Sequence, residues 1–248
     1  MHNVTERGLR EIVHGKALAA EGAEHAWNWA SAAGRVRAKR RAELIVRAAN
    51  IGPGMRVLEI GCGTGLFTEF FVAAGASVCA VDISPDLLEL ARQRGIDPKG
   101  VKFYCGEFES LDLPGPFDAV VGSSVLHHLD IALSLARIRD DLVPGGRLSF
   151  AEPNYLNPQV WAERRIPVVR RMMGASPDET AIVRWRLGRS LRELGFEDIS
   201  IRNFDWLHPA VPAALIPIVS SVGRMLEAVP LVKEFSGSVL IAAEKPSE

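Results

Sequence analysis

A glycine-rich segment near the first quarter of the chain has the composition of a backbone loop that wraps a ligand. Gly61, Gly63 and Gly65 alternate with single residues directly after an apolar run that contains Glu59. Glycine lets the backbone turn tightly and approach a ligand without a Cβ in the way. The pattern is G-x-G-x-G, and Leu66 occupies the third glycine position of the dinucleotide-binding pattern G-x-G-x-x-G. Glu59 would repel a pyrophosphate but can hold an ammonium group, directly or through water.

Two acidic residues further along the chain are placed to contact a nucleoside. Asp82 and Glu107 each follow a short apolar run. A carboxylate at the end of a strand in an α/β sheet can accept two hydrogen bonds from ribose hydroxyls, which is the role expected of Asp82. Ile83 can pack against an adenine, whose amino group can donate to Glu107. The backbone N–H of Phe108 can donate to a ring nitrogen of the same base.

A polar string with two histidines follows the next apolar run. Ser123 lies near its start, and His127 and His128 lie near its end. Imidazole titrates near neutrality, so either histidine can take the proton of an acceptor hydroxyl. The alternative for both is packing at the start of a helix. His127 and His128 are therefore the candidate catalytic residues.

The elements that must position these residues are strands and helices in alternation. We expect strands at 57–60, 77–81, 101–104, 117–121, 147–152, 196–203 and 238–243. We expect helices at 66–74, 84–94, 131–142 and 184–194. Continuous apolar strands separated by amphipathic helices indicate an α/β fold with a parallel sheet covered on both faces.

Composition excludes several classes of function. Hydrophobic residues make up 48% and charged residues 24% of the 248 residues, enough to bury a full core. The net charge of −1 gives no global reason to bind nucleic acid, and no nucleic-acid partner is expected. The three cysteines form no C-x-x-C pair, so no metal site or disulfide framework is expected. The first residues do not read as a signal peptide, which predicts a cytoplasmic protein.

Three segments outside the alternating core are candidates for the acceptor site. Residues 1–43 read as a helical cap, in which the basic run 35–41 predicts a solvated helix face or a contact of Arg37, Arg40 or Arg41 with a ligand. Prolines punctuate 153–183, an expected insertion over the edge of the sheet. Residues 209–232 predict an amphipathic helix, because prolines, Arg224 and Glu227 exclude a membrane span. Such a helix covers the core, walls an apolar pocket or makes peripheral contact with a membrane.

In order and spacing, these segments resemble the class I (Rossmann-like) S-adenosylmethionine-dependent methyltransferases. The branch they resemble most methylates small molecules, including ubiquinone- and sterol-type acceptors. The likeness covers about 44–153 and the closing strands. It implies a seven-stranded, mostly parallel sheet whose last strand is antiparallel, in a domain at 44–248 with acceptor-site insertions at about 153–183 and 206–232.

The resemblance also implies S-adenosyl-L-methionine as cofactor and a small-molecule acceptor, which could be apolar or lipid-like. The implied cofactor-binding residues are Glu59, Gly61, Cys62, Gly63, Gly65, Asp82, Ile83, Glu107, Phe108 and Ser123. The family more often has Asp at the position of Glu107. An NAD-dependent oxidoreductase and a non-catalytic binding module that kept this fold are the alternatives. Neither the acceptor nor the oligomeric state follows from the sequence.

Overall fold

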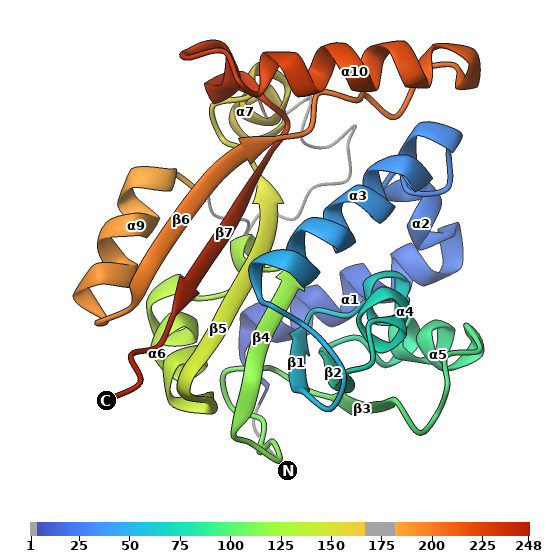
Figure 1. Ribbon diagram of the computed structural model, residues 1–248. Coiled ribbons are helices and arrows are strands. Elements are labelled where there is room, and N and C mark those ends of the chain that lie inside the picture. Colours follow the sequence, from blue (N-terminus) through green and yellow to red (C-terminus); the bar gives the residue numbers. More distant parts are fainter. Residues whose placement is uncertain (1–3, 167–181) are drawn as a thin grey trace.

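The sheet at the centre of the molecule has seven strands. The computed structural model describes residues 4–166 and 182–248. The strands are β1 (Arg56–Ile60), β2 (Ser77–Asp82), β3 (Val101–Cys105), β4 (Phe117–Ser123), β5 (Leu142–Pro153), β6 (Glu197–Phe204) and β7 (Ser238–Glu244). Their order is β3-β2-β1-β4-β5-β7-β6, and β7 runs antiparallel to both of its neighbours (Figure 1). The predicted fold class, including the antiparallel last strand, is confirmed.

Helices cover both faces of the sheet. They are α1 (Glu6–Glu21), α2 (Ala23–Ala26), α3 (Ala32–Ala48), α4 (Leu66–Ala73), α5 (Pro85–Gln93), α6 (Ile131–Asp141), α7 (Pro158–Arg165), α9 (Arg184–Glu193) and α10 (Ile216–Leu226). One apolar core joins α6 and α9 to the sheet, and the other joins α3 and α4 to the opposite face. Alternate residues of β1 feed the two cores, since Leu58 and Ile60 belong to one and Val57 to the other.

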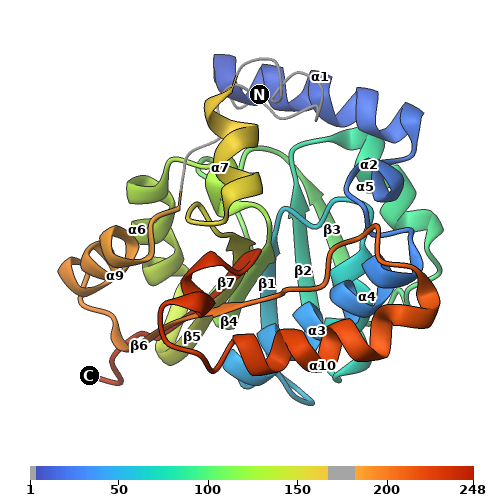
Figure 2. The ribbon, with the colours of Figure 1, turned by 90° about the horizontal axis from the view of Figure 1, so that it is seen from above.

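The N-terminal helix α1 lies across the carboxyl edge of the sheet, as the view from above shows (Figure 2). Thr5 caps its first turn by accepting a hydrogen bond from the backbone N–H of Gly8. Helix α3 runs without interruption through position 43, where the helical cap was expected to end. The segment before β1 is therefore joined to the sheet by a helix that packs in the core.

The amphipathic segment at 209–232 differs most from its predicted packing. Its helix, α10, is shorter than expected and is flanked by single turns of 3-10 helix at Ala213–Leu215 and Val232–Phe235. Of the predicted apolar face, Val219 and Leu226 are half-buried, whereas Leu215, Ile218, Val222 and Val229 are between 41% and 64% exposed. Met225 beside them is 69% exposed, and these five exposed residues form the exposed stripe of α10. The prediction that this face covers the core is therefore wrong. No helix in the described part of the chain is long and apolar enough to cross a membrane.

Candidate active site

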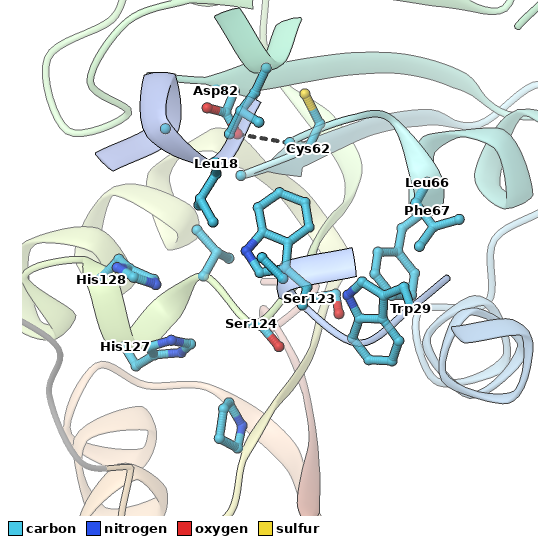
Figure 3. Close-up of a pocket in the computed structure, with 18 of the residues that line it drawn as sticks. Leu18, Trp29, Cys62, Leu66, Phe67, Asp82, Ser123, Ser124, His127 and His128 are labelled. Carbon is cyan, nitrogen blue, oxygen red and sulfur yellow. Dashed lines mark hydrogen bonds between the residues drawn. The ribbon is translucent and has the colours of Figure 1, made fainter. Parts of the chain in front are cut away.

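A cavity of about 930 Å³ lies where β1, β2 and β4 end. Its walls come from the loops after these strands, from the inward side of α1, and from the residues between α2 and α3 (Figure 3). Among the predicted site residues, Gly61, Cys62, Gly63, Asp82, Ile83, Glu107, Phe108, Ser123, His127 and His128 line it. Glu59 and Gly65 do not. Nearly all of the predicted site is thus brought together at one edge of the sheet.

The glycine loop forms the floor of the cavity. Gly61 and Gly63 have φ angles of +68° and +54°, a conformation that side chains other than glycine's rarely adopt. A Cβ on Gly61 would lie 2.4 Å from a methyl group of Val125, and one on Gly63 would lie 3.1 Å from the ring of Trp27. Gly65 precedes α4 in the left-handed conformation and faces Ala91 of α5 and Ile96 instead. The loop therefore needs glycine for its own packing as well as for access by a ligand.

Asp82 holds the glycine loop and also faces the cavity. Its two carboxylate oxygens accept hydrogen bonds from the backbone N–H groups of Gly63 and Ser84, each at 2.8 Å. Burial raises the pKa of Asp82, and these two hydrogen bonds oppose that rise. Figure 3 shows its side chain directed toward the loop at Cys62. The carboxylate is therefore fixed in place before any ligand binds.

Glu59 lies beneath the loop rather than in the cavity. Its carboxyl group is 1% exposed and accepts a hydrogen bond of 2.6 Å from the hydroxyl of Thr68 on α4. Burial raises the pKa of Glu59 to about 8. Glu59 shares the face of β1 that packs against α4, so it supports the loop from below. Glu59 does not line the cavity, so this geometry does not support the prediction that it contacts a ligand directly.

The protonation of Glu59 predicts how stability changes with pH. Its pKa is about 8 in the folded protein against an ordinary value of 4.5, so the folded state keeps a proton that the unfolded state releases. The free energy of unfolding should therefore fall as the pH rises from about 4.5 toward 8. Glu59→Gln keeps an acceptor for Thr68 but cannot ionise, and should lose this part of the fall. Urea unfolding at pH 5 and pH 8 measures the difference.

Glu193→Gln is the matched control, because Glu193 is exposed on α9. It should show the pH dependence of the native protein. Identical slopes for all three proteins would mean that Glu59 is ionised in the folded state, contrary to the burial argument.

The adenine end of the predicted site lies directly under α1. A Cβ on Gly15 would lie 2.5 Å from the hydroxyl of Ser84, and one on Gly8 would lie 3.1 Å from the side chain of Ile83. Glu107 accepts hydrogen bonds from both the backbone N–H and the hydroxyl of Thr5. Two glycines one heptad apart therefore let α1 approach the loop after β2 closely and roof this end of the cavity.

Arg41, one of the three arginines considered for contact with a ligand, is buried in the wall of the cavity. It is 3% exposed, lines the cavity, and donates to the carbonyl of Ala151 at 2.9 Å and to the hydroxyl of Ser238 at 2.5 Å. It also reaches the hydroxyls of Ser123 and Ser124 at 3.3 and 3.1 Å. Burial lowers its pKa to about 10, and its Nε has no hydrogen-bond partner among the described residues.

A helical signal for this burial was present in the sequence. Ala38, Arg41, Ala42 and Ile45 are all buried and recur at the spacing of one face of α3. Arg40 instead forms an ion pair with Glu227, outside the cavity. The prediction of a solvated helix face is therefore wrong for Arg41.

The two candidate histidines lie side by side on the 3-10 turn Leu126–His128. Their ring centroids are 4.3 Å apart. Nδ1 of His127 lies 2.6 Å from Glu152 at the end of β5, and Nδ1 of His128 lies 3.2 Å from Glu11 on α1. Both rings project toward the cavity on the side of Ser124 (Figure 3). Each imidazole thus has a carboxylate on its Nδ1 side.

The two expected insertions contribute to the wall of the cavity, but only in part. Asn157, Val160 and Glu163 contribute from the first insertion, whose residues 167–181 lie outside the described part of the chain. From the second, the residues from Trp206 to Pro209 line the cavity, while no residue of α10 does. The idea that the amphipathic helix walls the pocket is therefore contradicted. No cluster in the described ranges has the composition of a metal site.

Comparison with known proteins agrees with the observed fold. Residues 58–150 match a protein family described as "Methyltransferase domain". Over 106 residues the chain is 37% identical to the ubiquinone biosynthesis O-methyltransferase of Xanthomonas campestris pv. campestris. The matched segment makes up 41% of this chain and 44% of that protein. The chain thus spans less than half the length of this curated relative.

Solved structures extend the likeness to most of the chain. An S-adenosylmethionine dependent methyltransferase from Mesorhizobium loti has a TM-score of 0.62 at 23% identity, covering 84% of this chain and 100% of that one. The N-methyltransferase NodS from Bradyrhizobium japonicum, in complex with S-adenosyl-L-homocysteine, has a TM-score of 0.57 at 18% identity, covering 88% and 89%. The chain therefore has the class I methyltransferase fold. An NAD-dependent oxidoreductase finds no support in these comparisons.

Proposed function

We propose that this protein transfers a methyl group from S-adenosyl-L-methionine to a small-molecule acceptor. The observation that carries the proposal is the order of binding groups along the carboxyl edge of the sheet. Ile83 and Phe108 follow β2 and β3, Asp82 ends β2, the glycine loop follows β1, and Arg41 lies against the ends of β4 and β5. This order matches base, sugar, amino-acid chain and carboxylate in an adenosine-linked amino acid.

Four parts of the cofactor have a partner of suitable chemistry in the cavity: the ribose hydroxyls, the adenine, the methionine chain and the terminal carboxylate. Asp82 offers carboxylate lone pairs to the ribose hydroxyls, and Ile83 and Phe108 offer apolar surface to the adenine. Gly61 and Gly63 leave room above the loop for the methionine chain. Arg41 has a charge that suits the terminal carboxylate, and its Nε has no hydrogen-bond partner among the described residues. When bound, the cofactor supplies a methyl group activated by a sulfonium.

The protein's own contribution to such a reaction is mainly positioning. Methyl transfer is an in-line displacement, and holding the reactants in a suitable geometry can lower a barrier by about 7–11 kcal/mol. The roof formed by α1 and Trp27 covers part of the cavity. A histidine of the turn Leu126–His128 accepts the proton when the acceptor is a hydroxyl. An acceptor that is already anionic, or a carbon nucleophile, requires no base.

Ligand-induced stabilisation tests the proposal. S-adenosyl-L-homocysteine at 100 times its Kd should stabilise the folded protein by about 2.7 kcal/mol, and the melting temperature should rise accordingly. NAD at the same concentration should leave the melting temperature unchanged. No shift with S-adenosyl-L-homocysteine would overturn the proposal. A shift without turnover on any phenol, catechol or amine would favour the non-catalytic binding module.

The exposed stripe of α10 supports peripheral membrane contact as part of this function. Apolar residues that cover neither the core nor the cavity suit the surface of a lipid bilayer, from which an apolar acceptor would come. Ile218→Asp combined with Met225→Asp should reduce co-sedimentation with phosphatidylglycerol vesicles. Leu133→Asp, which changes an equally exposed residue of α6, is the control and should bind like the native protein. Equal binding by all three proteins would exclude α10 as the contact.

A further inference from the structure

We propose that Arg7 of α1 binds a carboxylate group of the methyl acceptor, so that the acceptor belongs to the class of anionic small molecules. The inference deepens the proposed methyl transfer and rests on it for the identity of the other ligand in the cavity. An acceptor of this class can still be apolar over the rest of its surface. Three observations carry the proposal: the charges in the cavity, the contacts of Arg7 and its place on α1.

The arginines that line the cavity among the described residues differ in their contacts. Arg37 forms an ion pair with Asp205, through Nε at 2.9 Å and Nη2 at 2.8 Å. Arg41 donates to serine hydroxyls and to a backbone carbonyl, and its charge suits the carboxylate of the cofactor. That carboxylate is the one anionic group of S-adenosyl-L-methionine. Arg7 is therefore a cation beyond those that the cofactor requires.

The guanidinium group of Arg7 is unsatisfied along one edge. Its Nε and Nη2 are both buried, and neither has a hydrogen-bond partner among the described residues. These two nitrogens lie on the same edge of the planar group, which is the edge that Arg37 presents to Asp205. Such an edge matches the two oxygens of a carboxylate. Burying a charge without a partner is costly, and a ligand that supplies the carboxylate would remove that cost.

The place of Arg7 on α1 puts it on the same side of the cavity as the candidate histidines. Four residues with the spacing of one helical stripe line the cavity: Arg7, Glu11, His14 and Leu18. Glu11 in this stripe lies 3.2 Å from Nδ1 of His128. Gly8 and Gly15 form a separate stripe, which packs on the loop after β2 at the adenine end. Arg7 thus belongs to the stripe that faces the acceptor and not to the one that roofs the adenine.

The helix also sets the length of the acceptor. Arg7 precedes Glu11 by four residues, so their Cβ atoms are roughly 5–6 Å apart. Glu11 in turn contacts the turn that carries both histidines. An acceptor whose reacting hydroxyl lies at these histidines therefore reaches Arg7 with a carboxylate on the opposite side of one aromatic ring.

A matched pair of small molecules tests this charge preference directly. 4-Hydroxybenzoate carries its hydroxyl and its carboxylate on opposite sides of one ring, and 4-hydroxybenzamide has nearly the same shape without the charge. Titration calorimetry of the protein saturated with S-adenosyl-L-homocysteine measures the Kd of each. The native protein should bind 4-hydroxybenzoate about 10- to 100-fold more tightly, the range expected for hydrogen bonds to a charged group.

Arg7→Gln should remove this preference and leave the affinity for the amide close to native. Lys16→Gln is the matched control, because Lys16 is exposed on the same helix and does not line the cavity. It removes the same charge and should keep the native preference. Equal affinity of the native protein for the two probes, or an undiminished preference in a folded Arg7→Gln variant, would refute the proposal. The native titration decides even if the variant fails to fold.

The melting temperature separates this proposal from the methyl transfer on which it rests. Arg7→Gln should keep the native rise with S-adenosyl-L-homocysteine, because the glycine loop, Asp82 and Arg41 are unchanged. A native protein that prefers the carboxylate through Arg7 but gains no stability from S-adenosyl-L-homocysteine would sink the methyl transfer and keep the anion site. A native protein that gains this stability but does not distinguish the two probes would keep the methyl transfer and exclude the role of Arg7.

Discussion

Asp82→Asn should lower the affinity for S-adenosyl-L-homocysteine by roughly 100-fold or more. A hydrogen bond to a charged group contributes about 1.5–3 kcal/mol, and each 1.4 kcal/mol changes an equilibrium constant about tenfold. Two ribose hydroxyls would lose a carboxylate partner. Asp82 now accepts hydrogen bonds from the backbone N–H groups of both Gly63 and Ser84, one on each oxygen. Asparagine has a single side-chain oxygen and would keep only one of these two hydrogen bonds.

Isothermal titration calorimetry and the ligand-induced rise in melting temperature measure this loss. Asp112→Asn removes the same charge from an exposed position and should bind like the native protein. The melting temperature without ligand separates loss of affinity from loss of fold. Full affinity in a folded Asp82→Asn variant would remove the sugar-binding role of Asp82 and, with it, the order of contacts on which the proposed function depends.

Local patterns predicted the parts of the site that one short segment builds alone. The spacing of Gly61 and Gly63 and the position of Asp82 at a strand end each specify a backbone conformation within a few residues. The strands and the antiparallel β7 followed from the same pattern and the family resemblance. Glu59 shows the limit of this reasoning, because the alternation of side chains along β1 sends it to the α4 face and away from the cavity.

The remaining parts of the site depend on contacts between distant segments. Arg41 lines the cavity only because α3 packs its charge against the ends of β4 and β5, more than 80 residues later in the chain. Glu152 contacts His127 across 25 residues, through a pairing that no spacing rule encodes. The exposed face of α10 is a third case, since amphipathicity predicts an apolar face but not which surface covers it. Such features follow from tertiary packing.

His127→Asn should produce the largest loss of turnover among single changes at the acceptor side. The asparagine amide can still donate to Glu152, as Nδ1 of His127 now does, but it offers no group that accepts a proton at neutral pH. General base catalysis contributes about 10²–10⁴-fold, so kcat should fall by that factor on a hydroxyl acceptor. Binding of S-adenosyl-L-homocysteine should stay close to native, since the glycine loop and Asp82 are unchanged.

The rate at which S-adenosyl-L-homocysteine is released gives kcat. The acceptor in this assay is the phenol, catechol or amine that the native protein methylates. His128→Asn is the matched control, because it removes the neighbouring ring at 4.3 Å but leaves His127 on Glu152, and its loss should be smaller. If His128→Asn lost more turnover than His127→Asn, His128 rather than His127 would be the base. The size of the His127→Asn effect also reports on the acceptor. A large loss requires an acceptor that binds with its proton still attached, whereas a nucleophile that is already anionic gains little from a base.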